Sequence, residues 1–210
     1  MLEALMVTVE VDPARVESRL AAGEIGCPCC VDGTLGGWGH ARPRRVVGVA
    51  DPVRPRRARC RACLVTQVLL PVTLLLRRAY AAELVWAALA GKAVGSGHRR
   101  IAERLSVPPT TVRGWLRVFA GRLHAVWAWF IEVAVTAGVD VTVPDATGRW
   151  RGALIAVATA AVAIRSRFGA VSVLGPVTPC RVAVSCSGGR LLAPGWPPPR
   201  AAVRTNTNRP

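Results

Sequence analysis

The stretch from His98 to Phe119 constrains the fold most, because its apolar residues, its short turn and its charges have the spacing of two packed helices. Its first half places apolar residues on one helical face, and its second half repeats that spacing. These residues are Ile101, Ala102 and Leu105, followed by Val112, Trp115, Leu116 and Phe119. Residues 106–109 leave room only for a tight turn, and Pro109 suits a first helical turn. The sequence therefore predicts a helix-turn-helix whose second helix begins near Pro109.

In such a motif the second helix lies in the major groove of DNA, and its exposed N-terminal residues meet the base edges. Here those residues are Thr110, Arg113 and Arg117. The two arginines are four apart and share one face, and a guanidinium can form two parallel hydrogen bonds with guanine. Ser106 stands where these turns usually carry glycine, and Gly114 weakens the second helix by about 1 kcal/mol. The alternative is a two-helix packing unit with a solvated basic face.

The positive charge is concentrated around this motif. The chain has a formal net charge of +16, and residues 42–122 hold 17 Arg and Lys against three acidic residues. All but Lys92 of those basic residues are arginines, which favours contacts with phosphate and guanine over mere solubility. Double-stranded DNA is therefore the expected partner, although some of these arginines would also suit a solvated face. The candidate DNA contacts are Thr110, Arg113, Arg117, Arg99, Arg100, Arg42, Arg44, Arg45, Arg54, Arg56 and Arg57.

Four of the seven cysteines have the spacing of a zinc ribbon. Cys27 with Cys30 and Cys60 with Cys63 form two Cys-x-x-Cys pairs, and the residues between the pairs suit short β-hairpins. Two such turns supply the four thiolates of a closed structural Zn²⁺ site, which leaves no ligand position open for catalysis. Chance thiols or a redox pair are the alternatives. Cys29 is surplus to this spacing, although the residues leave open whether it replaces a ligand.

The order of these signals predicts an α+β chain, in which a small β zinc ribbon precedes an all-α helix-turn-helix domain. Asp12 as N-cap, Pro13 and Gly23 delimit a helix in an N-terminal lead-in, which spans residues 1–25. The ribbon spans 26–76 and includes a buried strand at 64–70. The helix-turn-helix domain spans 77–122 and includes a third, supporting helix from 80 to 90 that ends at Gly91.

A helical extension is expected over residues 123–168. Residues 169–210 are expected to form a poorly ordered C-terminal tail that is largely without structure. Apolar residues in and before the extension step by three and four along Leu116, Phe119, Leu123, Val126, Phe130, Val133 and Ala137. This seam suits packing within the chain, with Gly121 separating two helices, or the formation of a homodimer. An Ala- and Val-rich helix is expected within 153–164. Ordinary packing is expected for Trp38 and His40, and free thiols for Cys180 and Cys186.

No membrane segment is expected from the sequence. The longest uncharged runs have 13 residues, which is short of the ~20 that a spanning helix needs. Glu3 and Glu10 stand where a secretory signal would have a basic start and an apolar core. We therefore expect a cytoplasmic, nucleoid-associated protein, in which cysteines serve as thiols or metal ligands before they serve as disulfides.

Several motifs in order resemble an uncharacterised family of actinobacterial zinc-ribbon helix-turn-helix proteins found with transposable elements. They are CPCC, GWGHARPRR, CRAC, LLP and GHRRIAERLSVPPTTVRGWLR, with GGRLLAP and NTN near the end. The resemblance covers residues 12–122 well and the remainder only in short pieces. It implies a DNA-binding factor in transposition or in transcription regulation, which acts beside a separately encoded transposase. Cys29 and Ser106 depart from the family's pattern.

Two other classes of function are the alternatives to a DNA-binding protein. A transposase needs several carboxylates around two metal ions in a large α/β domain, whereas only Glu132, Asp140 and Asp145 follow Arg122. The expectation is therefore a protein that is no enzyme and has no small-molecule substrate, with a degenerate transposase as the remote alternative. The other alternative is a zinc-stabilised module that binds protein or RNA, which would show weak binding to duplex DNA without sequence preference.

Overall fold

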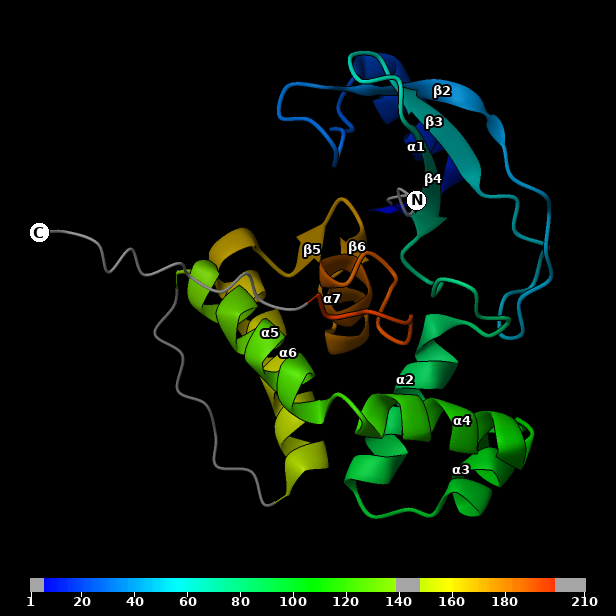
Figure 1. Ribbon diagram of the computed structural model, residues 1–210, viewed down its shortest axis with the longest axis vertical. Helices are drawn as coiled ribbons and strands as arrows, with labels where there is room; N and C mark the ends of the chain where they lie inside the picture. Colours follow the sequence, from blue (N-terminus) through cyan, green and yellow to red (C-terminus); the bar gives the residue numbers. More distant parts are fainter. Residues whose placement is uncertain (1–5, 139–147, 199–210) are drawn as a thin grey trace, which may run out of the picture.

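The computed structural model describes residues 6–138 and 148–198 (Figure 1). A four-stranded sheet with one helix forms the N-terminal part, and the remaining described residues are mainly helical. The chain is thus a mixed α+β protein with a small sheet, as the sequence predicts.

The sheet has the strand order β1-β4-β3-β2. Its strands are β1 (Met6–Val9), β2 (Leu35–His40), β3 (Arg56–Cys60) and β4 (Thr66–Pro71). The last three form an antiparallel meander, whereas β1 lies parallel to β4 at the edge. The predicted hairpins within residues 35–59 take a different form, because β2 pairs with β3 across a long loop. In that loop Arg44 and Val53 form only an isolated bridge.

Helix α1 (Pro13–Ala22) follows the predicted signals at both ends. The Asp12 side chain accepts a hydrogen bond from the Ala14 amide at 2.9 Å, and Gly23 ends the helix in the left-handed conformation with φ 71°. Its apolar face carries Val16 and Leu20, which join a buried cluster with β1, β2, β3 and β4. The helix therefore belongs to the core that supports the cysteines.

Helix α2 (Ala82–Ala93) differs in its bounds from the predicted helix over 80–90, because it continues through Gly91. The missing side chain at Gly91 lets α3 (His98–Leu105) pack closely, since a Cβ there would lie 3.2 Å from the Ile101 side chain and 2.6 Å from Arg104. Gly91 is therefore a packing position rather than a helix stop.

Helices α3 and α4 (Pro109–Ala120) are joined by a tight turn. Ser106 takes the left-handed conformation at φ 52° and ψ 42°, and Val107 is buried beneath it. Ser106 thus adopts the backbone geometry for which glycine is preferred. The apolar residues of the two helices close on each other and on α2, as their spacing predicts: Ile101, Ala102, Val112, Trp115, Leu116 and Phe119 are buried in one cluster.

The apolar seam packs within the chain. Gly121 separates α4 from α5 (Leu123–Thr136), as predicted, and α5 lies along α6 (Arg149–Phe168), which includes the expected helix at 153–164 (Figure 1). Val126 and Phe130 of α5 are fully buried in one cluster with the alanines of α6. The ring centroid of Phe119 lies 5.3 Å from that of Trp150, so α4 also contacts α6.

The expected disorder of residues 169–210 is wrong for residues 169–198. This segment forms β5 (Val171–Ser172), β6 (Gly175–Pro176) and α7 (Pro179–Cys186), followed by a stretch in which Leu192 and Trp196 are buried. Thr178 caps α7 by accepting a hydrogen bond from the Arg181 amide at 3.3 Å. Residues 199–210 lie outside the described residues, as do Asp140 and Asp145.

The backbone carbonyls of the C-terminal segment bind the connector between β4 and α2 and the turn between α4 and α5. The Leu76 amide donates to Gly189 O at 2.8 Å, and Arg78 Nη2 donates to Leu192 O at 2.6 Å. Arg122 Nη1 donates to the carbonyls of Ala193 and Trp196, each at 2.7 Å. The segment between α7 and residue 196 therefore contacts both parts of the molecule.

Among the described residues, no single helix has the length and apolar character needed to span a membrane. Only α4 and α5 taken together meet that criterion, and a 67° bend separates them.

Candidate metal centre and basic surfaces

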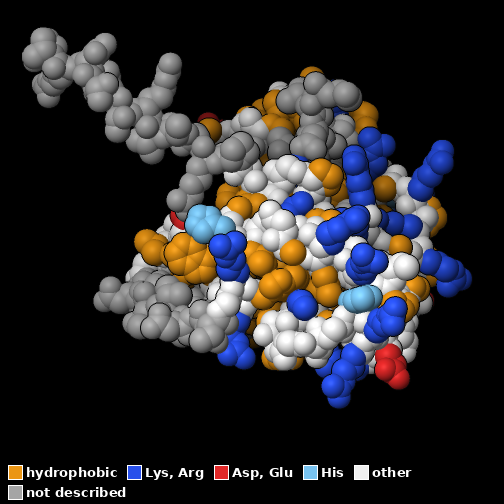
Figure 2. Space-filling model, turned by 60° about the horizontal axis from the view of Figure 1, so that its bottom comes forward, with side chains coloured by type: hydrophobic (Ala, Val, Ile, Leu, Met, Phe, Trp, Pro, Cys, Tyr) orange, Lys and Arg blue, Asp and Glu red, His pale blue; other side chains and the backbone are white. Residues whose placement is uncertain are grey.

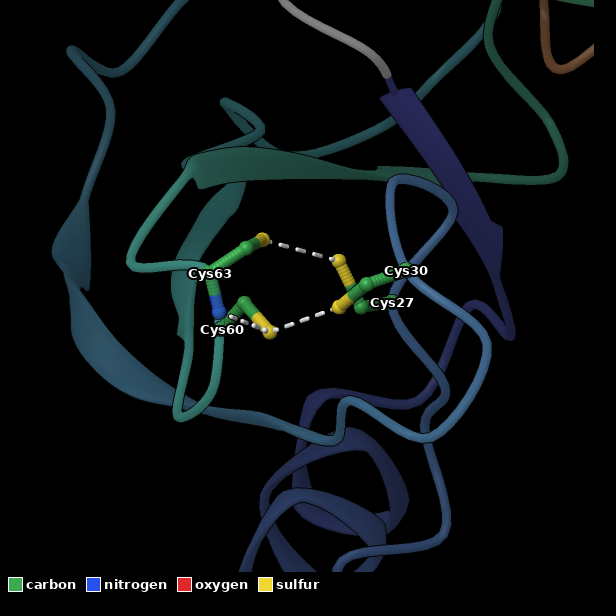
Figure 3. A group of neighbouring side chains, drawn as sticks. All are labelled: Cys27, Cys30, Cys60 and Cys63. Carbon is green, nitrogen blue, oxygen red and sulfur yellow. Dashed lines mark hydrogen bonds between the residues drawn. The ribbon is translucent and has the colours of Figure 1, made fainter.

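Four cysteine sulfurs converge at one side of the sheet (Figure 3). Cys27 and Cys30 come from the turn after α1, Cys60 ends β3, and Cys63 lies in the turn between β3 and β4. The four Sγ atoms lie within 4.8 Å of one another, with Cys27 to Cys63 at 3.7 Å and Cys30 to Cys60 at 3.5 Å. A tetrahedral Zn²⁺ with Zn–S bonds of about 2.3 Å would separate its sulfurs by about 3.8 Å. This cluster can therefore hold a metal ion of that size.

Backbone amides turn toward these sulfurs and favour thiolate. The amides of Ala62 and Cys63 each donate to Cys60 Sγ at 3.4 Å, and the Cys29 amide donates to Cys27 Sγ at 3.3 Å. The Cys63 amide lowers the pKa of Cys60 to about 6, whereas the hydrogen bond between Cys30 and Cys60 raises the pKa of Cys30 to about 12. A bound cation would release the proton that Cys30 otherwise retains, because metals bind thiolates.

Cys29 is outside the set of four, in agreement with its surplus place in the spacing. Its Sγ accepts a hydrogen bond from Gln67 Nε2 at 3.2 Å, and Gln67 is fully buried in β4. Desolvation by burial raises the pKa of Cys29, which favours the neutral thiol there. Cys180 and Cys186 lie in α7 and are free thiols, as predicted.

Gly33 has no side chain, and two cysteine sulfurs occupy the space that a side chain would fill. A Cβ at this position would clash with Cys30 Sγ and lie 2.6 Å from Cys60 Sγ. We expect Gly33→Ala to weaken metal binding by about ten- to a hundredfold, the range found when residues that orient metal ligands are replaced. Competition with a chromophoric chelator would measure the loss. Gly26→Ala is the matched control, since a Cβ there meets no atom within 4 Å, and an equal loss in both variants would contradict this role for Gly33.

The predicted contacts of the second helix are exposed on one face of α4, with Thr110 and Arg113 in its N-terminal half and Arg117 in its last turn. Thr110, Arg113 and Arg117 are all exposed, while Val112 and Trp115 between them are buried. Arg99 and Arg100 are exposed at the start of α3. Figure 2 shows Lys and Arg side chains gathered over this face, with few acidic side chains among them. Side chains from α3 and α4 thus contribute to one positively charged surface.

The predicted DNA contacts in β3 and in the loop before it divide into two groups. Arg42, Arg45, Arg54 and Arg57 are exposed. Arg44 is half-buried, and desolvation lowers its pKa. Arg56 is bound to Glu17 of α1, with Nε 2.5 Å from Oε1, and also donates to Gly39 O at 2.6 Å. Arg56 therefore connects α1 to the sheet, and Arg44 is partly withdrawn from solvent.

Trp38 is not packed in the core, contrary to the expectation. Its side chain is 54% exposed on β2, and the guanidinium carbon of Arg59 lies 4.7 Å from its ring centroid. His40 is exposed at the end of the same strand. The physical reason is that the neighbouring glycines at 36, 37 and 39 supply no apolar surface to cover the ring. The exposure of this ring and its contact with Arg59 were therefore not predicted, although the run of glycines was a usable signal.

An apolar cavity of about 360 Å³ lies between β1, α1 and the loop at 49–56. Glu10 is one of its lining residues, and Arg19 Nη1 lies 2.8 Å from Glu10 Oε2. The sulfur cluster and the exposed residues of α4 do not line this cavity.

Comparison with known proteins finds no matching family model, no matching curated protein and no matching solved structure. The resemblance to zinc-ribbon helix-turn-helix proteins stays a prediction that these comparisons do not test.

Proposed function

We propose that this protein binds double-stranded DNA in a sequence-specific manner, with a structural zinc ribbon and a helix-turn-helix. The observation that carries the proposal is the pairing of α3 and α4. Their apolar faces are buried against α2, and one face of α4 presents Thr110, Arg113 and Arg117 to solvent, from its first turn to its last. That is the side of a second helix that meets base edges in this motif.

The turn supports a helix-turn-helix more strongly than the spacing alone did. Ser106 lies in the left-handed region, so its presence in place of glycine does not alter the backbone path. The charge supports the same partner, since Arg99 and Arg100 are exposed beside the arginines of α4. Phosphate contacts fix a protein on the duplex, and base contacts give it sequence preference.

The proposed metal is zinc, and its proposed role is structural. All four ligands are sulfurs, which suits Zn²⁺ better than the hard cations Mg²⁺ and Ca²⁺. A fully occupied Cys₄ set leaves no position for a substrate or for an activated water. We therefore propose no catalytic role for this site. A role in transposition or in transcription regulation, beside a transposase, follows only from the resemblance. A place in the nucleoid would follow from DNA binding itself.

The experiment that tests this function distinguishes residues that recognise the base sequence from residues that only hold the protein on the DNA backbone. Arg113→Ala should flatten the preference for the selected sequence, because a bidentate contact with a base provides roughly 1–3 kcal/mol of discrimination. A triple variant of Arg45, Arg54 and Arg57 to alanine should weaken binding to every sequence. It should also reduce the slope of log K against log salt, which we expect near −5 for about six phosphate contacts in the wild type.

Selection of bound sequences from a random pool, followed by titrations at several salt concentrations, measures both effects. Arg165→Ala is the control, because this exposed arginine lies on α6, outside the proposed surface. A wild-type salt slope near zero on every duplex would remove DNA as the partner. If Arg113→Ala kept the sequence preference and the triple variant lost it, β3 and the loop before it would recognise the base sequence, and α4 would not.

A further inference from the structure

The face of the sheet around Trp38 has a composition that duplex recognition by α4 does not explain. The Trp38 ring keeps about half of its surface in solvent, at 54% exposure, and belongs to no buried cluster. Gly37 and Gly39 flank it on β2, so no neighbouring side chain on that strand covers it. The large aromatic ring of Trp38 is thus exposed to solvent on β2, an edge strand of the sheet.

The orientation of Arg59 on this ring is fixed by the protein. Its Nε donates to Leu64 O at 3.0 Å, and its guanidinium carbon lies 4.7 Å from the centre of the Trp38 ring. A planar guanidinium on an indole face is a cation–π pair, which favours Trp for the ring and Arg for the cation. The pair forms a flat, charged platform whose geometry exists before a ligand binds.

Further positive charge surrounds this platform. Arg57 lies two residues before Arg59 on β3, so both point to the same face of the sheet. Arg61 is exposed in the next turn, and its Nε would lie 3.3 Å from a Cβ at Gly36, which is next but one to Trp38. From residue 33 to residue 82 the sequence contains one acidic residue, Asp51. The face therefore complements a chain of phosphates.

We infer that Trp38, Arg57, Arg59 and Arg61 form a binding surface for single-stranded nucleic acid. An unpaired base stacks on the ring of Trp38, and the arginines contact the neighbouring phosphates. Proteins that hold single strands combine these two elements, a basic surface that follows the backbone and aromatic rings that accept any base. Paired bases within a duplex are stacked on one another and have no face available for an exposed ring. The inference goes beyond the proposed function, because it assigns unpaired bases to Trp38, whereas the proposed duplex binding shares only Arg57 with this surface.

The test measures binding of the zinc-loaded full-length protein to a short fluorescent oligothymidylate by anisotropy. We expect Trp38→Ala to weaken this binding by about ten- to a hundredfold, the loss typical of removing one stacking ring. Trp38→Phe should retain most of the affinity. An oligonucleotide of the same length and charge made of abasic sites should bind the wild type and Trp38→Ala equally, since it offers phosphates but no bases.

Trp127→Ala is the matched control, because Trp127 is another tryptophan, 38% exposed, on α5 away from the sheet. Zinc content and far-ultraviolet circular dichroism establish that each variant is folded. Equal binding of oligothymidylate by Trp38→Ala and the wild type would overturn the inference, as would an equal loss with the abasic strand or with duplex DNA. A wild type that binds duplex but no single strand would overturn it and leave the proposed function intact. A wild type that binds single strands but no duplex would support the inference and contradict the proposed function.

Discussion

Replacing Cys60 with serine should release the metal and unfold the N-terminal sheet. Cys60 is 1% exposed at the end of β3, and its sulfur accepts two backbone hydrogen bonds and contacts that of Cys30. A structural Zn²⁺ contributes roughly 10–16 kcal/mol in small zinc domains, which is comparable to or larger than the whole stability of most domains. The sheet and α1 share only a small buried cluster, so we expect no folded metal-free form of this part.

Metal analysis and circular dichroism of the purified variants measure this effect. Cys29→Ser is the control, since Cys29 contacts Gln67 and lies outside the four converging sulfurs. It should keep one equivalent of zinc and the wild-type spectrum. Loss of metal in Cys29→Ser together with retention in Cys30→Ser would show that the ligand set is different.

Replacing Phe119 with alanine should lower the free energy of unfolding of the helical part by about 3–5 kcal/mol. Phe119 is fully buried and contacts Trp150, so its ring fills the space between α4 and α6. Its removal leaves a cavity in a closely packed core, and neighbouring side chains relax only partly into such a space. Urea denaturation followed by circular dichroism would measure the change.

Val162→Ala is the control for this prediction, because Val162 is 49% exposed on α6. It should change the free energy of unfolding by about 0.5 kcal/mol or less. A similarly small change for Phe119→Ala would mean that α4 does not pack against α6 as described.

Local signals predicted the features that local chemistry determines. The cap at Asp12, the stop at Gly23 and the helical spacing of Ile101 and Val112 each depend on neighbours within a few residues. The four cysteines were predictable as well, because two short turns of equal spacing leave few other ways to arrange the ligands. The apolar seam indicated α5, because helical spacing is also a local signal. Only the structure identifies α6 as the surface against which α5 packs.

Features that depend on contacts between distant residues were not predictable. The ion pair of Arg56 is one of them, because its partner Glu17 lies 39 residues away in another element. The need for glycine at position 33 was not predictable either, since the sulfurs that would clash with a Cβ there come together only in the fold. The segment after residue 169 has few long apolar runs, and its short helix is stabilised by burial of residues such as Val182 and Val184 rather than by a strong helical pattern.

The backbone carbonyls of residues 189–196 have a consequence for the two nucleic-acid-binding surfaces that we propose. They accept hydrogen bonds from Leu76 and Arg78, in the connector between β4 and α2, and from Arg122, between α4 and α5, so the sheet and the helices are not joined by a free linker. When two binding surfaces are held at a set separation, the second contact forms at a high effective concentration, provided that the ligand spans that separation. A nucleic acid of matching geometry would then gain avidity from both surfaces, and one with a different spacing between its duplex and its unpaired bases would gain none.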